Sequence, residues 1–428
     1  MLVPSLLLPS RAPLALLAML SLASFGAGTA AAQLPAGPPP PRRTVLLTGY
    51  WPPTNEAVRR FSPNPAQNPL GWIGSDWESR GYDVVSYFPE FTPPNCTSCG
   101  PGSGDLEVDY QDTSNDFWAI VAAVKPIAIV TLSRGFPGLL WEVEMNMPNL
   151  ATWSNDFVAP FAPPVLPPDS SVPAGFMRTS TLPAQDIAQQ VNAAGLGLTA
   201  FVCTAADSGA FLSGYIAYHG MWYQSLHASP VDPDWCVAAG HIHVGTNVSW
   251  PIAEAAVQVT LRSVIRRVDD ARGIREAFCF GDGLDPSVTS ACPCANVGAA
   301  RHGCANSVQP DGARLSGSGF SVPDSIVLQA DGLSGLTCIF LQGDARADFV
   351  FGDGVACVGG GLLRLRAQVV TGGASSFPLP GDPSVSTRGQ VVPGSGARRY
   401  YQTYYRNAAA GFCPPATFNV TNGVVIDW

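Results

Sequence analysis

Short apolar runs alternate with longer amphipathic segments from Thr44 to about Gly273, and this alternation constrains the fold more than any other feature of the chain. The apolar runs have the length of buried strands, and the amphipathic segments have the length and periodicity of helices. Such alternation predicts an α/β fold with a mostly parallel sheet. The expected strands are 44–48, 83–88, 127–132, 198–203 and 237–244. The expected helices are 115–124, 184–194, 209–226 and 251–272.

A second region with a different pattern runs from 276 to 428. Glycine, serine and short alternating runs dominate it, which predicts a smaller all-β domain, a sandwich or a barrel. An odd number of the cysteines lies there, so one of them is expected to remain unpaired or to be bonded elsewhere. Cys292, Cys294 and Cys304 gather near His302, which makes a metal site an alternative. Their spacing matches no standard zinc pattern, and we favour disulfides.

The N-terminus has the pattern of a secretory signal peptide over residues 1–32. Arg11 precedes an apolar run, and small residues ending at Ala32 follow it. A proline-rich linker, 33–43, then leads to the α/β domain, 44–273. We therefore predict a secreted, periplasmic or cell-surface protein whose cysteines meet oxidising conditions.

Charge and hydropathy exclude two classes of partner. The 23 basic and 32 acidic residues give a net charge of −9, which argues against binding to nucleic acid or to an anionic membrane. After the signal peptide no apolar stretch reaches the roughly 18 residues that a bilayer span needs. We therefore predict neither a nucleic-acid partner nor a membrane span.

Histidine is scarce, with 5 residues in the chain, so few imidazoles can serve as a base. His241 and His243 lie two positions apart in an expected strand and therefore share one face. One interpretation is a metal-binding pair. The other is that each is a hydrogen-bonded core histidine.

A second chemical feature follows the expected strand 198–203. Asp207 or Ser208 would cap a helix whose first turn reaches Ser213. A nucleophile there would lie near unpaired backbone N–H groups and the positive end of the helix dipole. The alternative is an ordinary capped helix whose serines only satisfy backbone groups.

Five segments in chain order resemble motifs of the pyroglutamyl peptidase I (pyrrolidone-carboxylate peptidase) family of cysteine peptidases. They are LLTGYWP at 46–52, NPLGW at 68–72, TSTLP at 179–183, DSGAFLS at 207–213 and GHIH at 240–243. The resemblance covers 44–272, about half of the chain. It implies a three-layer α/β/α sandwich, and a Cys-His-Glu triad that removes an N-terminal pyroglutamyl residue without metal or cofactor.

The resemblance also implies the catalytic positions. The base falls on His243, and the nucleophile position holds Ser213 where the family has cysteine. The orienting acid falls on Glu142, with Glu144 as the alternative because the motif there is one residue short. Cys203 lies outside the nucleophile motif, and we do not expect it to substitute.

The same resemblance assigns substrate contacts. The family's paired phenylalanines sandwich the lactam ring, and their positions hold Tyr50 and Pro53 here. The position held by Tyr50 thus keeps an aromatic ring, and the position held by Pro53 does not. Together with Asn68 of the second motif, these residues are the predicted substrate-binding positions.

Two functional hypotheses follow, with a minor third. The first is a secreted amide hydrolase acting on N-terminally blocked peptides through a Ser-His-Glu triad. The second is a catalytically inactive binding or surface protein on the same fold, and the third is a metal-dependent hydrolase. The stretch 292–307 resembles cysteine- and glycine-rich modules that end diverse secreted bacterial proteins, for which we expect a role in surface attachment.

Overall fold

The computed structural model describes residues 43–96, 99–205, 209–284 and 288–428. The predicted signal peptide and almost all of the linker lie outside these residues, as do Asp207 and Ser208. No helix in the described ranges is long and apolar enough to cross a bilayer. The helices and strands fall into an α/β region (43–272) and a β region (277–427).

One mixed sheet organises the α/β region, with its strands in the order β2-β1-β5-β10-β6-β9. The strands are β1 (Arg43–Thr48), β2 (Tyr82–Tyr87), β5 (Ala128–Arg134), β6 (Leu140–Glu144), β9 (Thr199–Cys203) and β10 (Ala238–Val244). Neighbouring strands from β2 to β10 are parallel. Strand β6 runs antiparallel to β10 and parallel to β9, so the last two strands are reversed.

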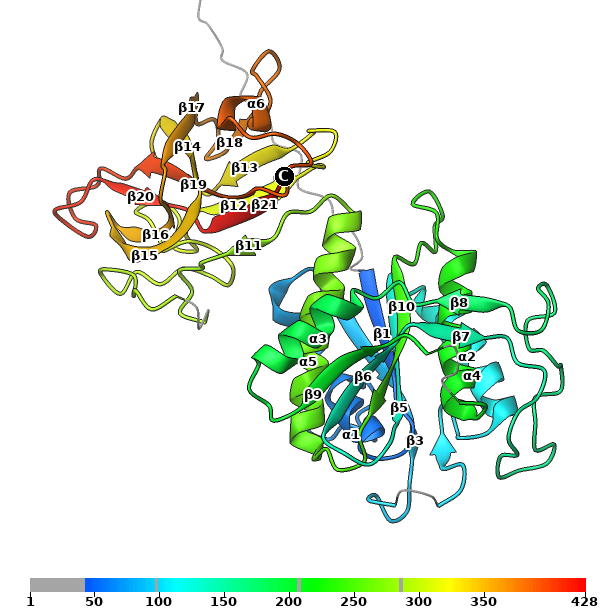
Figure 1. Ribbon diagram of the computed structural model, residues 1–428. Helices are drawn as coiled ribbons and strands as arrows, with labels where there is room; N and C mark the ends of the chain where they lie inside the picture. Colours follow the sequence, from blue (N-terminus) through cyan, green and yellow to red (C-terminus); the bar gives the residue numbers. More distant parts are fainter. Residues whose placement is uncertain (1–42, 97–98, 206–208, 285–287) are drawn as a thin grey trace, which may run out of the picture. The chain divides into compact units, whose positions relative to one another are not determined.

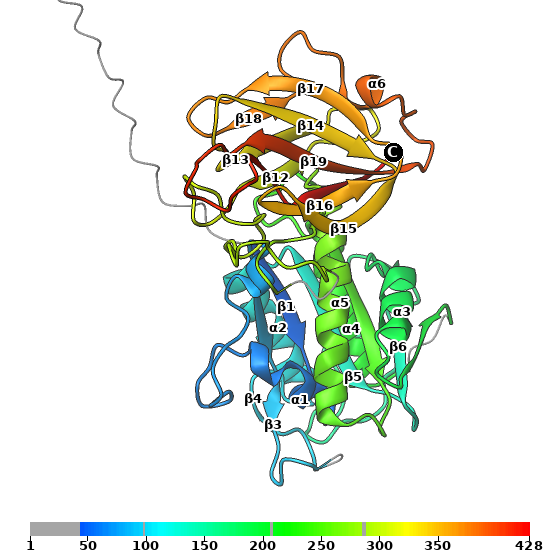
Figure 2. The ribbon, with the colours of Figure 1, turned by 90° about the vertical axis from the view of Figure 1, so that its left-hand side faces the viewer.

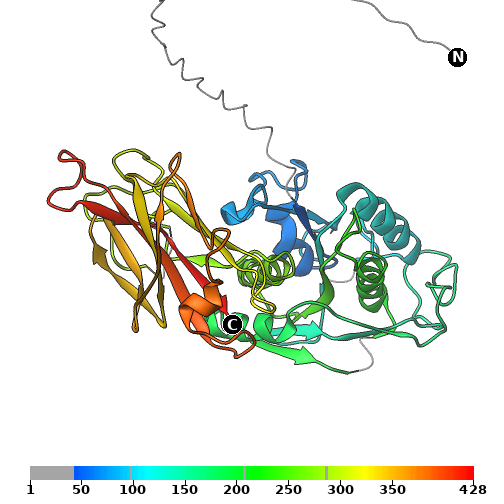
Figure 3. The same cartoon turned by 90° about the horizontal axis from the view of Figure 1, so that it is seen from above.

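Helices cover both faces of this sheet (Figures 1 and 3). They are α1 (Thr54–Val58), α2 (Tyr110–Val124), α3 (Ala184–Ala193), α4 (Leu212–Leu226) and α5 (Trp250–Ala271). Helix α5 lies beside α1 and α3, as Figure 2 shows, and α2 packs with α4. The single-turn helices are η1 (Arg59–Phe61) and η2 (Trp77–Ser79), and the short paired strands are β3 (Pro89–Glu90), β4 (Ser103–Gly104), β7 (Asn146–Pro148) and β8 (Met177–Thr179).

Alternation along the strands creates the two cores. Val45 and Leu47 of β1 enter the cluster that contains the buried residues of α1, α3 and α5. Leu46, between them, faces the opposite way into the cluster of α2 and α4. Because successive side chains of a strand point to opposite faces, a strand buried on both sides is largely apolar rather than alternating. This requirement explains why β1, β5 and β10 could be recognised in the sequence.

Glycine at position 240 is required by close packing against β10. A Cβ there would collide with Ser180 Oγ and come within 2.8 Å of Leu182 Cδ1. We expect Gly240→Ala to lower the free energy of unfolding by about 1–3 kcal/mol through overpacking. Gly220→Ala in α4 is the matched control, since its Cβ would meet Ile129 and Thr131 methyls at an ordinary 3.5 Å. Urea titration of both variants tests this, and equal stability would contradict it.

The β region forms antiparallel sheets packed as a sandwich. Its elements are β11 (Ala277–Phe278), β12 (Arg314–Ser318), β13 (Val327–Asp331), β14 (Thr337–Gly343), β15 (Ala345–Phe351), β16 (Gly354–Gly359), β17 (Leu363–Val369), β18 (Ser375–Phe377), α6 (Val385–Gly389), β19 (Arg398–Arg406), β20 (Phe418–Val420) and β21 (Gly423–Asp427). One sheet has the order β11-β21-β19-β14-β17, and a second has the order β12-β13-β18. Phe340 of the first sheet packs on Phe377 of the second, with ring centroids 6.1 Å apart.

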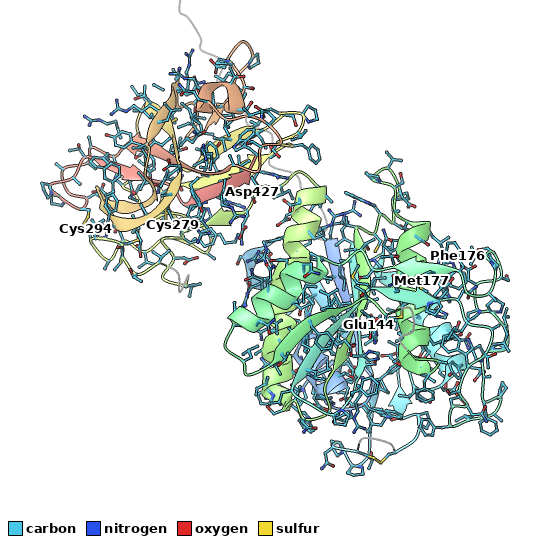
Figure 4. The ribbon with its side chains drawn as sticks, viewed as in Figure 1. Glu144, Phe176, Met177, Cys279, Cys294 and Asp427 are labelled. Atoms are coloured by element: carbon cyan, nitrogen blue, oxygen red, sulfur yellow. A yellow bond between two sulfur atoms is a disulfide. The ribbon has the colours of Figure 1, made fainter. Side chains whose placement is uncertain are left out.

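Disulfides link distant parts of the β region. The pairs are Cys279–Cys357, Cys292–Cys304 and Cys294–Cys413, and Cys279 and Cys294 are labelled in Figure 4. Cys338 is the free cysteine that the odd count predicted, and it is buried. The cysteines near His302 are therefore disulfide partners rather than metal ligands.

The longest disulfide loop gives the largest expected stabilisation. Cys294 and Cys413 are 119 residues apart, so their bond strongly restricts the unfolded chain. We expect replacing both by serine to cost about 2–5 kcal/mol of unfolding free energy. Replacing Cys96 and Cys99, which are only 3 residues apart, is expected to cost less. Calorimetry of the two double variants measures the difference, and the reverse ranking would contradict the loop argument.

The predicted fold class is confirmed. The five expected strands and four expected helices of the α/β region are present, with ends displaced by up to a few residues. Strand β6, helix α1 and the short strands β3, β4, β7 and β8 were not predicted. Helix α4 begins at Leu212 instead of the predicted Gly209.

Candidate active site

Polar side chains interrupt the core on the sheet face that α4 covers. Ile129 and Ala239 belong to the apolar cluster beneath α4. Further along the same strands, the same face carries Thr131, Ser133, His241 and His243, since these positions differ by two residues. Buried polar groups require partners, and these side chains have them.

His243 and Glu144 form a buried hydrogen-bonded pair. Nδ1 of His243 lies 2.9 Å from Oε1 of Glu144, which is 3% exposed. Glu144 is labelled in Figure 4. Among the described residues, Nε2 of His243 has no hydrogen-bond partner, and the side chain is 11% exposed. A carboxylate on one ring nitrogen and a free second nitrogen are the arrangement that a general base needs.

Glu142 is not the carboxylate that holds this imidazole. The β6–β10 register places Glu142 directly opposite His243 and Glu144 opposite His241, yet the hydrogen bond runs diagonally to Glu144. Diagonal neighbours on one face remain within reach of long side chains. The preference for Glu142 is therefore corrected to Glu144, the alternative that the shortened motif had left open.

His241 is a core histidine. Thr131 Oγ1 lies 2.8 Å from Nδ1, and Ser133 Oγ lies 2.7 Å from Nε2. Burial, followed by the neighbouring His243, holds the pKa of His241 well below its usual value, so its ring is neutral. Its ring contacts that of His243 edge to face, with centroids 4.7 Å apart. The two histidines thus have separate partners, and a metal-binding pair does not describe them.

Ser213 follows the first residue of α4, the helix that packs on β5 and β10. The N-cap is Phe211, and its side chain makes no capping hydrogen bond. The backbone N–H of Tyr215 donates to the carbonyl of Phe211. The first-turn N–H groups before Tyr215 therefore have no acceptor within the helix. Ser213 makes no hydrogen bond to His243 within the described ranges. Of the predicted triad, the structure brings only the imidazole and a glutamate into contact.

Cys203 lies beside the two glutamates at the end of β9. One potential ligand atom from each of Glu142, Glu144 and Cys203 falls within 4.8 Å of the others. Burial, together with the two carboxylates, raises the pKa of Cys203 to about 11. The thiol is therefore protonated at neutral pH and is a poor nucleophile.

The predicted substrate-binding residues are largely engaged in packing. Tyr50 is 3% exposed, and its hydroxyl lies 2.6 Å from Thr113 Oγ1. Burial raises the pKa of Tyr50 well above its usual value. Pro53 precedes α1 as its N-cap. The Asn68 amide donates to the carbonyls of Arg60 and Ser62, so its NH₂ group closes a loop.

An aromatic cluster that the sequence analysis missed lies next to the start of α4. Phe211, the N-cap, has its ring centroid 6.2 Å from that of Trp51 and 6.4 Å from that of Phe157. Trp51 and Phe157 meet edge to face at 5.6 Å. The available signal was that Phe211 stands two residues before the candidate nucleophile. The three rings form an apolar aromatic surface next to the start of α4, whereas the ring of Tyr50 is buried.

Comparisons with known proteins return similar folds. No protein-family model matches the chain, and no curated protein matches it. The chain is similar to solved pyroglutamyl peptidases. Pyrrolidone carboxyl peptidase from Thermococcus litoralis matches at 15% identity and a TM-score of 0.40, over 54% of this chain and 96% of that one.

Two further solved structures show the same degree of likeness. Pyroglutamyl peptidase I from Bacillus amyloliquefaciens matches at 17% identity and a TM-score of 0.38, over 54% of this chain and all of that one (100%). A mutant pyrrolidone carboxyl peptidase from Pyrococcus furiosus matches at 16% identity and a TM-score of 0.38, over 52% of this chain and 98% of that one.

Proposed function

We propose that the protein is a pyroglutamyl-peptidase-like hydrolase that cleaves the amide bond after a blocked N-terminal residue. Ser213 is the nucleophile, His243 the base and Glu144 the orienting acid. The observation that carries the proposal is the buried His243–Glu144 hydrogen bond, on the sheet face covered by the helix that bears Ser213. The five sequence segments that resemble the peptidase family support Ser213 and His243, and they leave Glu144 as the alternative to Glu142.

The proposed reaction begins with attack of Ser213 Oγ on the amide carbonyl. His243 Nε2 takes the hydroxyl proton, and Glu144 holds the ring through Nδ1 and stabilises the imidazolium. The tetrahedral intermediate collapses to an acyl-enzyme as His243 returns the proton to the leaving amine. Water then attacks the ester with His243 again as base, which releases the blocked residue and restores Ser213.

The start of α4 is suited to stabilise the oxyanion. Its first-turn N–H groups receive no cap from the side chain of the N-cap Phe211, and they lie at the positive end of the helix dipole. Donors fixed before the reaction stabilise developing negative charge without reorganisation. We therefore assign the oxyanion site to the backbone around Ser213.

The blocked N-terminal residue is proposed to rest on the aromatic cluster of Trp51, Phe157 and Phe211. A lactam ring is flat and uncharged, so an apolar aromatic wall suits it. This assignment replaces Tyr50, whose ring is buried in the core. The sequence further supports export and a surface-attachment role for the β region, which we include in the proposal.

The decisive experiment is turnover of a pyroglutamyl-coumarin amide by the mature protein, alongside a panel of N-terminally blocked peptides. Release of the fluorophore in the presence of EDTA is the expected result. Activity that EDTA abolishes would support the metal-dependent hydrolase instead. No turnover on any substrate would support the non-catalytic binding protein, in line with the missing direct hydrogen bond between Ser213 and His243.

A further inference from the structure

Three potential metal ligands converge beside the proposed triad. Glu142 and Glu144 lie two residues apart on β6, and Cys203 is the register partner of Glu144 on β9. All three therefore project from the same face of two adjacent strands. Their ligand atoms fall within 4.8 Å of one another. Glu142 and Cys203 are partly exposed, which leaves a path from solvent.

An unsatisfied buried oxygen points to a ligand at this cluster. Oε1 of Glu144 is hydrogen-bonded to His243, but Oε2 is buried and has no hydrogen-bond partner in the described part of the chain. Glu144 is only 3% exposed, so solvent reaches it poorly. A buried charged oxygen without a partner is costly, and a cation would remove that cost.

We propose that Glu142, Glu144 and Cys203 bind a thiophilic divalent cation of the Zn²⁺ class. Thiolate sulfur together with carboxylate oxygen suits zinc, whereas Mg²⁺ and Ca²⁺ take oxygen ligands. Zinc bonds of about 2.3 Å to sulfur and about 2.1 Å to oxygen place tetrahedral ligand atoms about 3.5 Å apart. Since the ligand atoms lie within 4.8 Å of one another, the cluster needs to contract by about 1.3 Å at most.

Binding is accompanied by a defined proton release. The Cys203 thiol loses its proton to solvent as the metal–sulfur bond forms. His243 keeps its bond to Glu144 Oε1 while the metal takes Oε2, so the histidine becomes an outer partner of the site. Water would complete the coordination. The site shares Glu144 with the proposed triad. Its thiol, Cys203, takes no part in the proposed reaction, so metal binding can be measured without an activity assay.

Binding of Co²⁺ and Zn²⁺ to the untagged mature protein tests this inference without an activity assay. We expect one equivalent of Co²⁺ to give a thiolate charge-transfer band in the near ultraviolet, and Zn²⁺ to displace it. Cys203→Ser is expected to abolish the band, and Glu142→Gln to weaken Zn²⁺ binding at least about 10-fold against a chromogenic chelator. Cys338→Ser, which alters a buried free thiol in the β region, is the control that retains both signals.

Two results would overturn the inference. One is the absence of a charge-transfer band in parent protein that circular dichroism shows to be folded. The other is equal Zn²⁺ affinity in the parent and in folded Cys203→Ser and Glu142→Gln variants. Neither result bears on turnover by Ser213, so failure of the metal site is distinguishable from failure of the proposed hydrolase.

Discussion

Replacing Ser213 by alanine is expected to lower kcat/KM for a pyroglutamyl-coumarin amide by at least about 10³-fold. Without the hydroxyl no acyl-enzyme forms, and only substrate binding and the backbone donors of α4 remain to assist water. The fold is expected to persist, because the alanine would lie in the first turn of a helix with no side-chain cap to lose. Initial rates across substrate concentration, with thermal melts alongside, measure both effects.

Two controls sharpen this prediction. Ser225→Ala changes an exposed serine in the last turn of the same helix and is expected to leave kcat/KM unchanged. Ser213→Cys is expected to be active and to become sensitive to iodoacetamide. For this comparison, both the Ser213→Cys variant and the parent protein carry Cys203→Ser. Unimpaired hydrolysis by folded Ser213→Ala would rule out the serine as the nucleophile. Activity that appears only in Ser213→Cys would identify a decayed cysteine site.

Replacing Glu144 by glutamine is expected to reduce kcat by about 10³- to 10⁴-fold. The glutamine is nearly isosteric but lacks the negative charge that stabilises the imidazolium, and its amide favours the wrong ring tautomer. The His243 Nδ1–Glu144 Oε1 bond of 2.9 Å is the contact being tested. The kcat and its pH profile are the measurements, because a purely structural loss would not alter the pH dependence of the remaining activity.

Glu142→Gln is the matched control for that prediction. It makes the same chemical change two residues away on the same strand face, opposite His243 in the register. We expect kcat to change by less than about 10-fold, since Glu142 does not hold the ring. If Glu142→Gln is the more damaging variant, the orienting acid is Glu142 and the hydrogen bond to Glu144 is not catalytic.

Much of the fold could be predicted because burial on both faces leaves a clear trace in the sequence. Strands β1 and β5 contain short uninterrupted apolar runs (45–47 and 128–130), and β10 keeps apolar residues on one face. Helix α5 has a regular apolar stripe with Pro251 in its first turn. Strand β6 escaped prediction because its glutamates alternate with apolar residues over only 5 positions. Short alternating segments of this kind do not stand out from loops.

The sequence indicated which residue types belong to the candidate site, but not which glutamate is hydrogen-bonded to His243. The assignment of His243 as the base came from the motif GHIH at 240–243, which resembles that of the peptidase family; the scarcity of histidine alone left His241 and His243 open. The choice between Glu142 and Glu144 depends on side-chain direction across two antiparallel strands, which linear spacing does not encode. Tyr50 was assigned to a substrate wall, whereas the fold uses its hydroxyl to bind Thr113 inside the core.

The reversed strand β6 has a consequence for how such a site changes over evolutionary time. A pleat repeats every two residues, so an acid can migrate along β6 in steps of two and still reach the same imidazole. A nucleophile on a helix has no such freedom, because each position turns the side chain by about 100°. Diverged lineages of this fold would then show a stationary serine or cysteine and a carboxylate that drifts between alternate positions.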